Sequence, residues 1–227
     1  MTGENDILES WKANACNWIQ TVTNQELESR RLVTDNAIVQ AVMHYAPARI
    51  LDLGCGEGWL SRALRKKGLE VWGTDGIAAL VENAIAADGP FYYQHTYEEI
   101  AKGRHALPGP FDAVVINFAL LDKDDSESLL VSLPRLLKSN GLVFIQTLHP
   151  FYMADTGDYR SGWKEGSWNG IKREFVFPYL WYFRTFEDWA ALFSRAGMII
   201  KAITEPVHPQ TGKPLSTIFT LKASRQT

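Results

Sequence analysis

The stretch from residue 50 to 62, ILDLGCGEGWLSR, is the feature that most limits the possible folds of this chain. A short apolar run ends in alternating glycines, and Trp59, Leu60, Ala63 and Leu64 then fall on one helical face. Glycines let the backbone turn sharply and let a ligand approach closely, while the N-terminus of a helix supplies free N–H groups. The stretch therefore predicts a buried strand, a glycine turn and a helix, arranged so that the turn can hold a ligand.

Three interpretations of this glycine turn compete. A phosphate-binding loop requires Gly-Lys-Ser/Thr after its second glycine, and here Gly58 is followed by Trp59 and Leu60. A dinucleotide-binding fingerprint would use Gly54 and Gly56 but needs a glycine where Trp59 stands, because its helix packs closely on the sheet. A glycine loop that binds nothing is the third possibility. The residues exclude the phosphate loop and disfavour the dinucleotide site.

The rest of the chain alternates between predicted strands and predicted helices. Two helices, at residues 7–22 and 34–44, precede the first strand. The runs that follow predict strands at 69–75, 90–94, 111–118 and 141–148 and helices at 77–87, 97–101 (a short loop or helix), 125–139 and 185–196. Pro134 should kink or split the third of these helices. Strands at 198–204 and 215–223 are too close in sequence for a helical crossover and should form an antiparallel hairpin. The alternation predicts an α/β fold with a mainly parallel sheet.

Length and composition favour a single domain covering residues 1–227. The formal net charge is −3, and without a basic excess we expect no nucleic-acid partner. Cys16 and Cys55 have no spacing typical of a zinc site or a disulfide framework, which favours a reducing, cytoplasmic location. The first ten residues are polar and acidic, unlike a signal peptide, and no apolar stretch approaches the ~20 residues that span a bilayer. We therefore expect neither export nor membrane insertion.

The segment LDLGCGEG resembles the first motif of the class I S-adenosylmethionine-dependent methyltransferases. In that family an acidic residue and a Gly-x-Gly-x-Gly turn surround the methionine and ribose parts of the cofactor. The resemblance implies that the cofactor contacts the residues of this turn, namely Asp52, Gly54, Cys55, Gly56 and Gly58. Asp75 ends the next predicted strand, 23 residues after Asp52, where a carboxylate can accept both ribose hydroxyls. Its neighbours Gly76 and Ile77 should line the same site.

The resemblance continues through most of the chain. The segment QHTYEEI lies where members of the family bind adenine, with Thr96 and Tyr97 the nearest candidates. The segment FDAVVINFALLD resembles the fourth motif, which implies that Asn117 and Phe118 bind the cofactor beside its methyl group. The segment LPRLLKSNGLVFIQTLHP resembles the following helix, turn and fifth strand. The implied fold is a doubly wound, mostly parallel sheet of seven strands with helices on both faces. Its strand order is 3-2-1-4-5-7-6, and strand 7 is antiparallel.

The chain departs from two branches of the family at the end of the fourth predicted strand. Enzymes that methylate nucleobase or glutamine amines continue from Asn with Pro-Pro-Tyr or Pro-Pro-Phe, whereas Asn117 is followed by Phe-Ala-Leu. Metal-dependent catechol-type enzymes have Asp at this position and an Asp-Asn pair later, which is absent here, so we expect no catalytic metal. The continuation resembles the branch that methylates small metabolites.

The segment 151–184 is predicted to form an aromatic-rich cap over the acceptor, inserted after the fifth strand of the sheet. Thirteen aromatic residues occur between 151 and 189 without a clear helical or strand period. A long irregular segment with this many large rings is better explained by a binding role than by disorder. We expect acceptor contacts from some of its residues, with candidates Tyr152, Trp163, Trp168, Tyr179 and Arg184. Most of the other rings should only pack the cap onto the sheet or form a dimer interface.

Two further groups complete the predicted site. His149 lies just past the fifth strand, and it could accept a proton from the acceptor at neutral pH or have only a structural role. The resemblance implies that the N-terminal helices, residues 1–46, cover the cofactor. Trp11 would lie against it, and Arg30 or Arg31 would bind its carboxylate unless both are solvated charges at a helix end.

The predicted function is methyl transfer from S-adenosylmethionine to an oxygen or nitrogen of a small-molecule acceptor, with S-adenosylhomocysteine as product. Two alternatives share the same motif. One is a binding module that holds the cofactor without catalysis, and the other is an enzyme that uses the cofactor for chemistry other than methyl transfer. The chain is expected to act as a monomer or homodimer.

Overall fold

A computed structural model describes residues 3–154, 157–166, 168, 171–178 and 180–223 of the chain. Seven strands form one twisted sheet in the order β3-β2-β1-β4-β5-β9-β8. These strands are β1 (Arg49–Leu53), β2 (Glu70–Asp75), β3 (Tyr92–Gln94), β4 (Phe111–Asn117), β5 (Leu137–Leu148), β8 (Met198–Thr204) and β9 (Ser216–Ala223). β1 to β5 are parallel, and β9 is antiparallel to both β5 and β8. Counted within this sheet, the order is the predicted 3-2-1-4-5-7-6.

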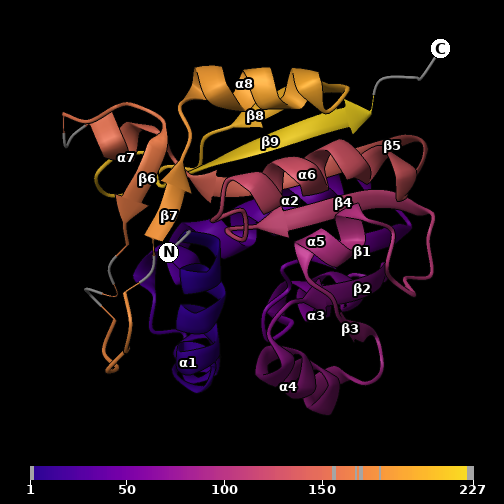
Figure 1. The fold of residues 1–227 in the computed structure, drawn as a ribbon, viewed down its shortest axis with the longest axis horizontal. Coiled ribbons are helices and arrows are strands. Elements are labelled where there is room, and N and C mark those ends of the chain that lie inside the picture. Colours follow the sequence, from indigo (N-terminus) through magenta and orange to yellow (C-terminus); the bar gives the residue numbers. More distant parts are fainter. Residues whose placement is uncertain (1–2, 155–156, 167, 169–170, 179, 224–227) are drawn as a thin grey trace.

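Helices cover both faces of the sheet (Figure 1). Those described are α1 (Gly3–Thr23), α2 (Asp35–Tyr45), α3 (Trp59–Arg65), α4 (Ala78–Asp88), α5 (Tyr97–Ala101), α6 (Asp124–Ser132), α7 (Phe151–Ala154) and α8 (Phe186–Arg195). Side chains of the central strands alternate between two cores: Val114 and Ile116 pack with α5, α6 and α8, whereas Ala113 and Val115 pack with α2 and α3. Because both faces are covered, the middle of each central strand is a continuous apolar run: Ile50–Leu51 in β1, Ala113–Ile116 in β4 and Leu142–Ile145 in β5.

The connections place the carboxyl ends of β1 and β4 next to each other. These strands are hydrogen-bonded neighbours, paired from Ile50 with Ala113 to Leu53 with Ile116. From β1 the sheet grows through β2 to β3, and from β4 it grows through β5 in the opposite direction. In doubly wound sheets, ligands bind at the carboxyl ends of the strands where this order reverses. The glycine turn after β1 and Asn117 at the end of β4 both lie at that point.

Two predicted elements differ from the structure. The helix expected over 125–139 ends at Ser132, a 3₁₀ turn occupies Leu133–Arg135, and Leu137 already pairs with Phe111 as the first residue of β5. Pro134 causes this early end, because it lacks an N–H and its ring clashes with the preceding helical turn. The segment 151–184, predicted to be without period, contains α7 and an antiparallel pair of strands, β6 (Gly162–Glu165) and β7 (Leu180–Phe183).

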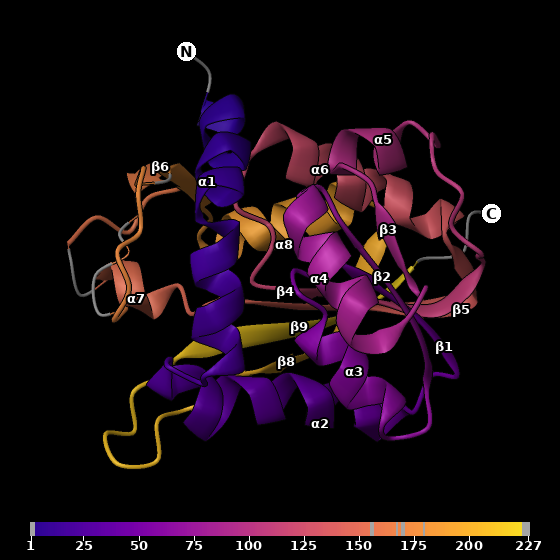
Figure 2. The same cartoon turned by 90° about the horizontal axis from the view of Figure 1, so that it is seen from below.

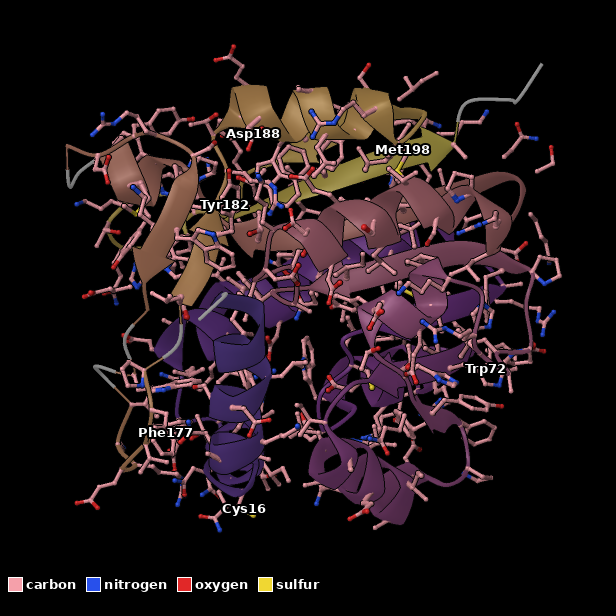
Figure 3. The ribbon with its side chains drawn as sticks, in the orientation of Figure 1. Cys16, Trp72, Phe177, Tyr182, Asp188 and Met198 are labelled. Carbon is pink, nitrogen blue, oxygen red and sulfur yellow. The ribbon has the colours of Figure 1, made fainter. Side chains whose placement is uncertain are left out.

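The N-terminal helix α1 crosses the carboxyl edge of the sheet, and the β6–β7 hairpin lies on its far side (Figure 2). Towards the sheet, Ala15 of α1 is buried with Ile77 and Leu80 at the start of α4. On the other side, the Ser10 hydroxyl donates a hydrogen bond of 2.6 Å to the carbonyl of Phe177, which lies beside α1 in Figure 3. The helix is therefore fixed between the sheet and the aromatic segment. Among the described residues, no helix is both long and apolar enough to cross a bilayer.

Candidate active site

The glycine turn between β1 and α3 has a backbone that only glycine adopts easily. Gly54, Gly56 and Gly58 have φ angles of +69°, +57° and +85°. A Cβ added at Gly54 would lie 2.4 Å from the Cβ of Ala119, and one added at Gly58 would lie 2.6 Å from the Tyr92 hydroxyl. The close packing at both places leaves no room for a side chain, so Gly54 and Gly58 are required by both conformation and space, and Gly56 by conformation.

Asp75 links the end of β2 to this turn. One carboxylate oxygen accepts a hydrogen bond of 2.9 Å from the backbone N–H of Gly56, and the other accepts one of 2.9 Å from the N–H of Ile77. Burial raises the pKa of Asp75 above its ordinary value, and the bonds from Ile77, Gly56 and Gly76 oppose that rise. The side chain is only half-buried, so its remaining lone pairs can face a ligand at the edge.

Asp52 and Cys55 support the turn from the inside. The Ser61 hydroxyl of α3 donates a hydrogen bond of 2.7 Å to the Asp52 carboxylate, and the side chain is buried. Burial raises the pKa of Asp52 to about 7, although the bond from Ser61 lowers it. The Cys55 thiol packs with Val81 and Tyr92, and burial raises its pKa as well. The Asp52 carboxylate therefore faces α3.

The two residues predicted at the adenine position behave differently. Thr96 is the N-cap of α5: its hydroxyl accepts from the Glu99 N–H at 3.2 Å, and the Glu99 carboxylate accepts from the Thr96 N–H at 2.9 Å. Tyr97 donates its hydroxyl to the carbonyl of Ala119 at 3.0 Å and so bridges α5 to the chain after β4. Burial raises the Tyr97 pKa well above its ordinary value. The phenol therefore stays neutral and lies directly beside Gly54.

The end of β4 combines an unpaired acceptor with an unusual backbone. The buried Oδ1 atom of Asn117 has no hydrogen-bond partner within the described part of the chain. The next residue, Phe118, has a φ of +54°, a left-handed conformation that is costly for a residue with a Cβ, while its N–H still donates to the Gln146 carbonyl at 2.8 Å. Such outliers concentrate at functional sites.

Tryptophans and an arginine cover the glycine turn. A Cβ at Gly56 would meet only the indole nitrogen of Trp18, at 3.8 Å, so α1 lies above the turn. The Arg30 guanidinium carbon lies over two indoles, 5.8 Å from the centre of the Trp18 ring and 4.8 Å from that of Trp59. Its Nε donates to Asp35 at 3.0 Å. Of the two candidate arginines, the structure thus places Arg30 at the turn.

Two further predicted residues differ in their contact with the side chains that cover the glycine turn. Trp11 packs edge-to-face against Trp18, with ring centres 5.2 Å apart, whereas the Arg31 side chain is exposed. The roles of Trp18 and Trp59 were not foreseen from the sequence. The seven-residue spacing of Trp11 and Trp18, which puts both on one helical face, was the available signal for Trp18.

The predicted acceptor residues do not form one group. Trp168 stacks on Phe175 with ring centres 4.3 Å apart. It also packs against Trp11, and so it contacts the tryptophans of α1. Trp163 packs edge-to-face on Tyr182, and Tyr152 is 63% exposed on α7. Tyr179 lies outside the described residues.

Arg184 directly follows β7, and its side chain binds the loop after β4. The residue is only 2% exposed. Its side chain donates hydrogen bonds to the carbonyls of Asp122 and Lys123 at 3.2 and 3.0 Å. The guanidinium also lies over the rings of Tyr182 and Trp189. Burial lowers its pKa. All these contacts are with the protein, so the structure does not present Arg184 to an acceptor as the sequence suggested.

Both ring nitrogens of His149 are already engaged. Nδ1 accepts a hydrogen bond of 3.0 Å from the Phe151 N–H, so Nε2 carries the proton and donates to the Glu205 carboxylate at 2.7 Å. Glu205 follows β8, which lies two strands from β5 at the outer edge of the sheet. The ring has no free lone pair for a substrate proton in this arrangement, and a role as base requires one of the two bonds to break.

Away from the turn, the described residues form neither a metal site nor a second pocket that reaches the glycine turn. Within the described ranges, no group of three or more His, Cys, Asp and Glu side chains could hold a metal ion. A broad depression of about 1030 Å³ lies over α5, α6 and α8; its lining includes Thr96 but no residue of the glycine turn. The Glu98–Lys102 and Glu127–Arg195 pairs in its lining bind each other.

Comparison with known proteins identifies the class of this fold and site. Residues 28–199 match the family model of a methyltransferase domain, which is well over half of the chain. The chain therefore belongs to this family of methyltransferase domains.

Two curated relatives are ubiquinone biosynthesis O-methyltransferases. The chain is 35% identical to the one from Pseudomonas aeruginosa over 112 residues, which cover 46% of each protein. It is 33% identical to the one from Dechloromonas aromatica over 119 residues, which cover 49% of each. The matches thus span about half the length of these relatives.

Solved structures share the fold at low sequence identity. An S-adenosylmethionine-dependent methyltransferase from Mesorhizobium loti is 24% identical, with a TM-score of 0.60 over 83% of this chain and 99% of the other. One from Clostridium acetobutylicum is 12% identical, with a TM-score of 0.64 over 92% and 98%. These likenesses establish the architecture only.

Proposed function

We propose that this chain transfers a methyl group from S-adenosylmethionine to a hydroxyl oxygen of a small-molecule acceptor. The observation that carries the proposal is the geometry of Asp75, whose carboxylate is fixed by Gly56 and Ile77 at the carboxyl ends of β1 and β2. Family membership supports methyl transfer, and the curated relatives, named as O-methyltransferases, favour oxygen over nitrogen as the site of attack.

The residues present fit this cofactor. At Gly56 the space that a side chain would fill is open up to the Trp18 indole, so a ligand can lie against the backbone there. Asp75 offers a fixed carboxylate for two ribose hydroxyls. Arg30 offers a cation for the cofactor carboxylate, since its Nε is held by Asp35 and its two terminal nitrogens make no hydrogen bond among the residues described. When bound, S-adenosylmethionine supplies a methyl carbon that is activated by positively charged sulfur.

The protein's own contribution is alignment and exclusion of water. Trp18 of α1 covers the turn with an apolar ring, Trp11 packs against Trp18, and an indole face also attracts a positive charge. Tyr97 packs against Gly54 on the other side. Alignment of two reactants in a dry site removes several kcal/mol from a barrier, so most of the rate could arise without a general base. The cap over residues 151–184 as an acceptor cover, the cytoplasmic location, the absence of a nucleic-acid partner and a monomeric or homodimeric state remain predictions.

Calorimetric titration tests the cofactor part of the proposal. Asp75→Asn should lower the affinity for S-adenosylhomocysteine by about 10-fold or more, because the charge-assisted bonds to ribose are lost. Gly54→Val should abolish binding, because its side chain would overlap Ala119 and Tyr97. The matched control is Glu70→Gln at the exposed start of the same strand. Equal affinities in all these proteins and the wild type would refute the proposed site.

Turnover tests the catalytic part. S-adenosylhomocysteine release is measured with a panel of phenols, aliphatic alcohols, amines and carboxylates, and product mass identifies the methylated atom. Methyl ethers are expected. Cofactor binding without release of S-adenosylhomocysteine, whichever class of acceptor is added, would favour a non-catalytic binding module. A product without an added methyl group would indicate different chemistry.

A further inference from the structure

Asn117 and Gln146 are direct partners on two neighbouring strands, β4 and β5, which lie side by side in Figure 1. Asn117 is the last residue of β4, and Gln146 precedes the end of β5 by two residues. Two residues earlier, the paired Val115 and Phe144 both pack into the core beneath α2 and α3. Because side chains two residues apart on a strand share a face, Asn117 and Gln146 project to that same face, side by side at the carboxyl edge.

Both side chains present a buried oxygen without a hydrogen-bond donor. Gln146 is 1% exposed, and its Nε2 donates to the Ser216 hydroxyl at 2.8 Å, which fixes the orientation of the carboxamide. Its Oε1 and the Oδ1 of Asn117 have no partner in the part of the chain that the structure describes. Buried polar atoms are nearly always paired in folded proteins, so two adjacent unpaired acceptors indicate a ligand that supplies the donor.

The position of this pair separates it from the cofactor residues. Along the carboxyl edge the order is Asp75 on β2, the glycine turn on β1, Asn117 on β4 and Gln146 on β5. Neighbouring strands lie about 4.8 Å apart, which places Gln146 roughly 10 Å from β1 and roughly 14 Å from β2. With the ribose held at Asp75, the space over β4 and β5 lies beyond the cofactor, on the acceptor side.

We propose that Asn117 and Gln146 form the recognition site for the acceptor and select a hydroxyl or amine that donates a hydrogen bond. Two carboxamide oxygens are acceptors only, so a hydroxyl or amine group satisfies them. A carboxylate offers no donor and its charge is repelled, and an apolar group leaves both oxygens unpaired. Sites built to bond a substrate hydroxyl reject analogues without it strongly. This inference rests on the proposed function, and it names the class of acceptor.

Nuclear magnetic resonance tests the pair without requiring turnover. The side-chain amide signals of Asn117 and Gln146 are followed in ¹⁵N-labelled protein, first with S-adenosylhomocysteine and then with phenol, benzylamine, toluene or benzoate at equal millimolar concentrations. Phenol and benzylamine should move the Gln146 signal, whereas toluene and benzoate should not. Equal effects of toluene and phenol, or no effect of either donor, would overturn the proposal. So would a full shift on adding S-adenosylhomocysteine alone, since the pair would then belong to the cofactor.

Substitutions separate this proposal from the proposed function. Gln146→Leu should weaken phenol binding at least 10-fold, measured on the Asn117 signal, and leave S-adenosylhomocysteine affinity within threefold, which also shows that the variant is folded. The matched control Gln94→Leu removes an exposed carboxamide at the end of β3 and should change neither. If wild-type protein binds phenol at this pair but no S-adenosylhomocysteine, the proposed function fails while the donor-binding site stands. Unchanged phenol binding in Gln146→Leu refutes the site itself.

Discussion

The guanidinium carbon of Arg30 lies 4.8 Å from the centre of the Trp59 ring, so the segment before α2 is fixed to the first residue of α3. Trp59 directly follows the last glycine of the turn, and the Trp18 ring centre lies 5.8 Å from the same guanidinium carbon. The charge is therefore held in place before any ligand arrives. A preorganised cation of this kind loses little side-chain entropy when it binds a carboxylate.

Arg30→Ala is expected to lower the affinity for S-adenosylmethionine by about 10-fold or more, because a charge-assisted pair with the cofactor carboxylate is lost. Arg31→Ala is the matched control, since that neighbouring side chain is exposed, and its affinity should stay within twofold of the wild type. Isothermal titration of both variants measures the difference. An equal loss in the two variants would mean that only the general charge of this segment matters.

Asp52→Asn is expected to stabilise the protein more at high pH than at low pH. Burial raises the folded-state pKa of Asp52 to about 7, whereas an unfolded aspartate has a pKa of about 3.9. Stability is therefore full below pH ~4 and falls as pH rises to ~7, because folding must then take up a proton onto the carboxylate that is ionised in the unfolded chain. Asparagine has no such charge and still accepts from the Ser61 hydroxyl.

The free energy of unfolding in urea, measured from pH 4 to 8, tests the Asp52 prediction. The gain in the variant should be close to zero at pH 4 and reach about 2–4 kcal/mol at pH 8. A difference between the two proteins that does not change with pH would contradict the raised pKa. Ser61→Ala is a useful companion, because it removes the bond that opposes the shift and should steepen the pH dependence of the Asp52 protein.

Sequence reasoning succeeded where the signal is local. The glycine turn and Asp75 are recognised from short motifs that lie within thirty consecutive residues, whereas the strand order was implied by the family resemblance and agrees with the structure. Thr185 was also recognised as a helix start, and its hydroxyl accepts from the Asp188 N–H at 3.2 Å. These features are determined by residues that lie close to one another in the sequence.

The features that sequence reasoning missed depend on contacts between distant segments. Arg184 is a plausible acceptor ligand in the sequence, but Tyr182, Trp189 and the carbonyls after β4 enclose it. The unpaired oxygen of Gln146 becomes visible only when β4 lies beside β5. β6 and β7 lack an apolar alternation in the sequence, because on this accessory sheet the residues of β6 are half-buried or exposed and only Phe183 of β7 is buried. Such properties are set by tertiary packing rather than by local preference.

Asn14→Ala is expected to weaken the attachment of α1, the helix that covers the glycine turn. Asn14 is fully buried on α1; its Oδ1 accepts from the Val176 N–H at 2.8 Å, and its Nδ2 donates to the carbonyls of Val176 and Ser10. Loss of these bonds leaves backbone groups of Val176 unpaired, which costs about 2 kcal/mol. Because α1 also covers Gly56, release of S-adenosylhomocysteine should become several-fold faster in stopped-flow measurements.

The control for Asn14 is Asn17→Ala, which removes a single exposed hydrogen bond to the carbonyl of Glu174 on the same helix. Its unfolding free energy should change by less than about 0.5 kcal/mol and its release rate by less than twofold. If both variants release the product at the wild-type rate while Asn14→Ala is clearly destabilised, then the contact between α1 and residues 173–177 stabilises the fold without retaining the cofactor.

His149→Gln is expected to affect stability more than catalysis. The imidazole joins the end of β5 to Glu205 beyond β8 and packs edge-to-face on Phe186, with ring centres 5.5 Å apart. Its removal should lower the unfolding free energy by about 1–2 kcal/mol, or the melting temperature by roughly 2–8 °C, and Glu205→Gln should reproduce part of that loss.

With any acceptor that the panel identifies, kcat of His149→Gln should stay within about threefold of the wild type, since neither ring nitrogen is free to take a proton. A general base would give the opposite pattern, in which kcat falls by 10²–10⁴ with little change in stability and Glu205→Gln has a smaller effect. The ratio of the two losses, measured on the same preparations, therefore decides between a structural histidine and a catalytic one.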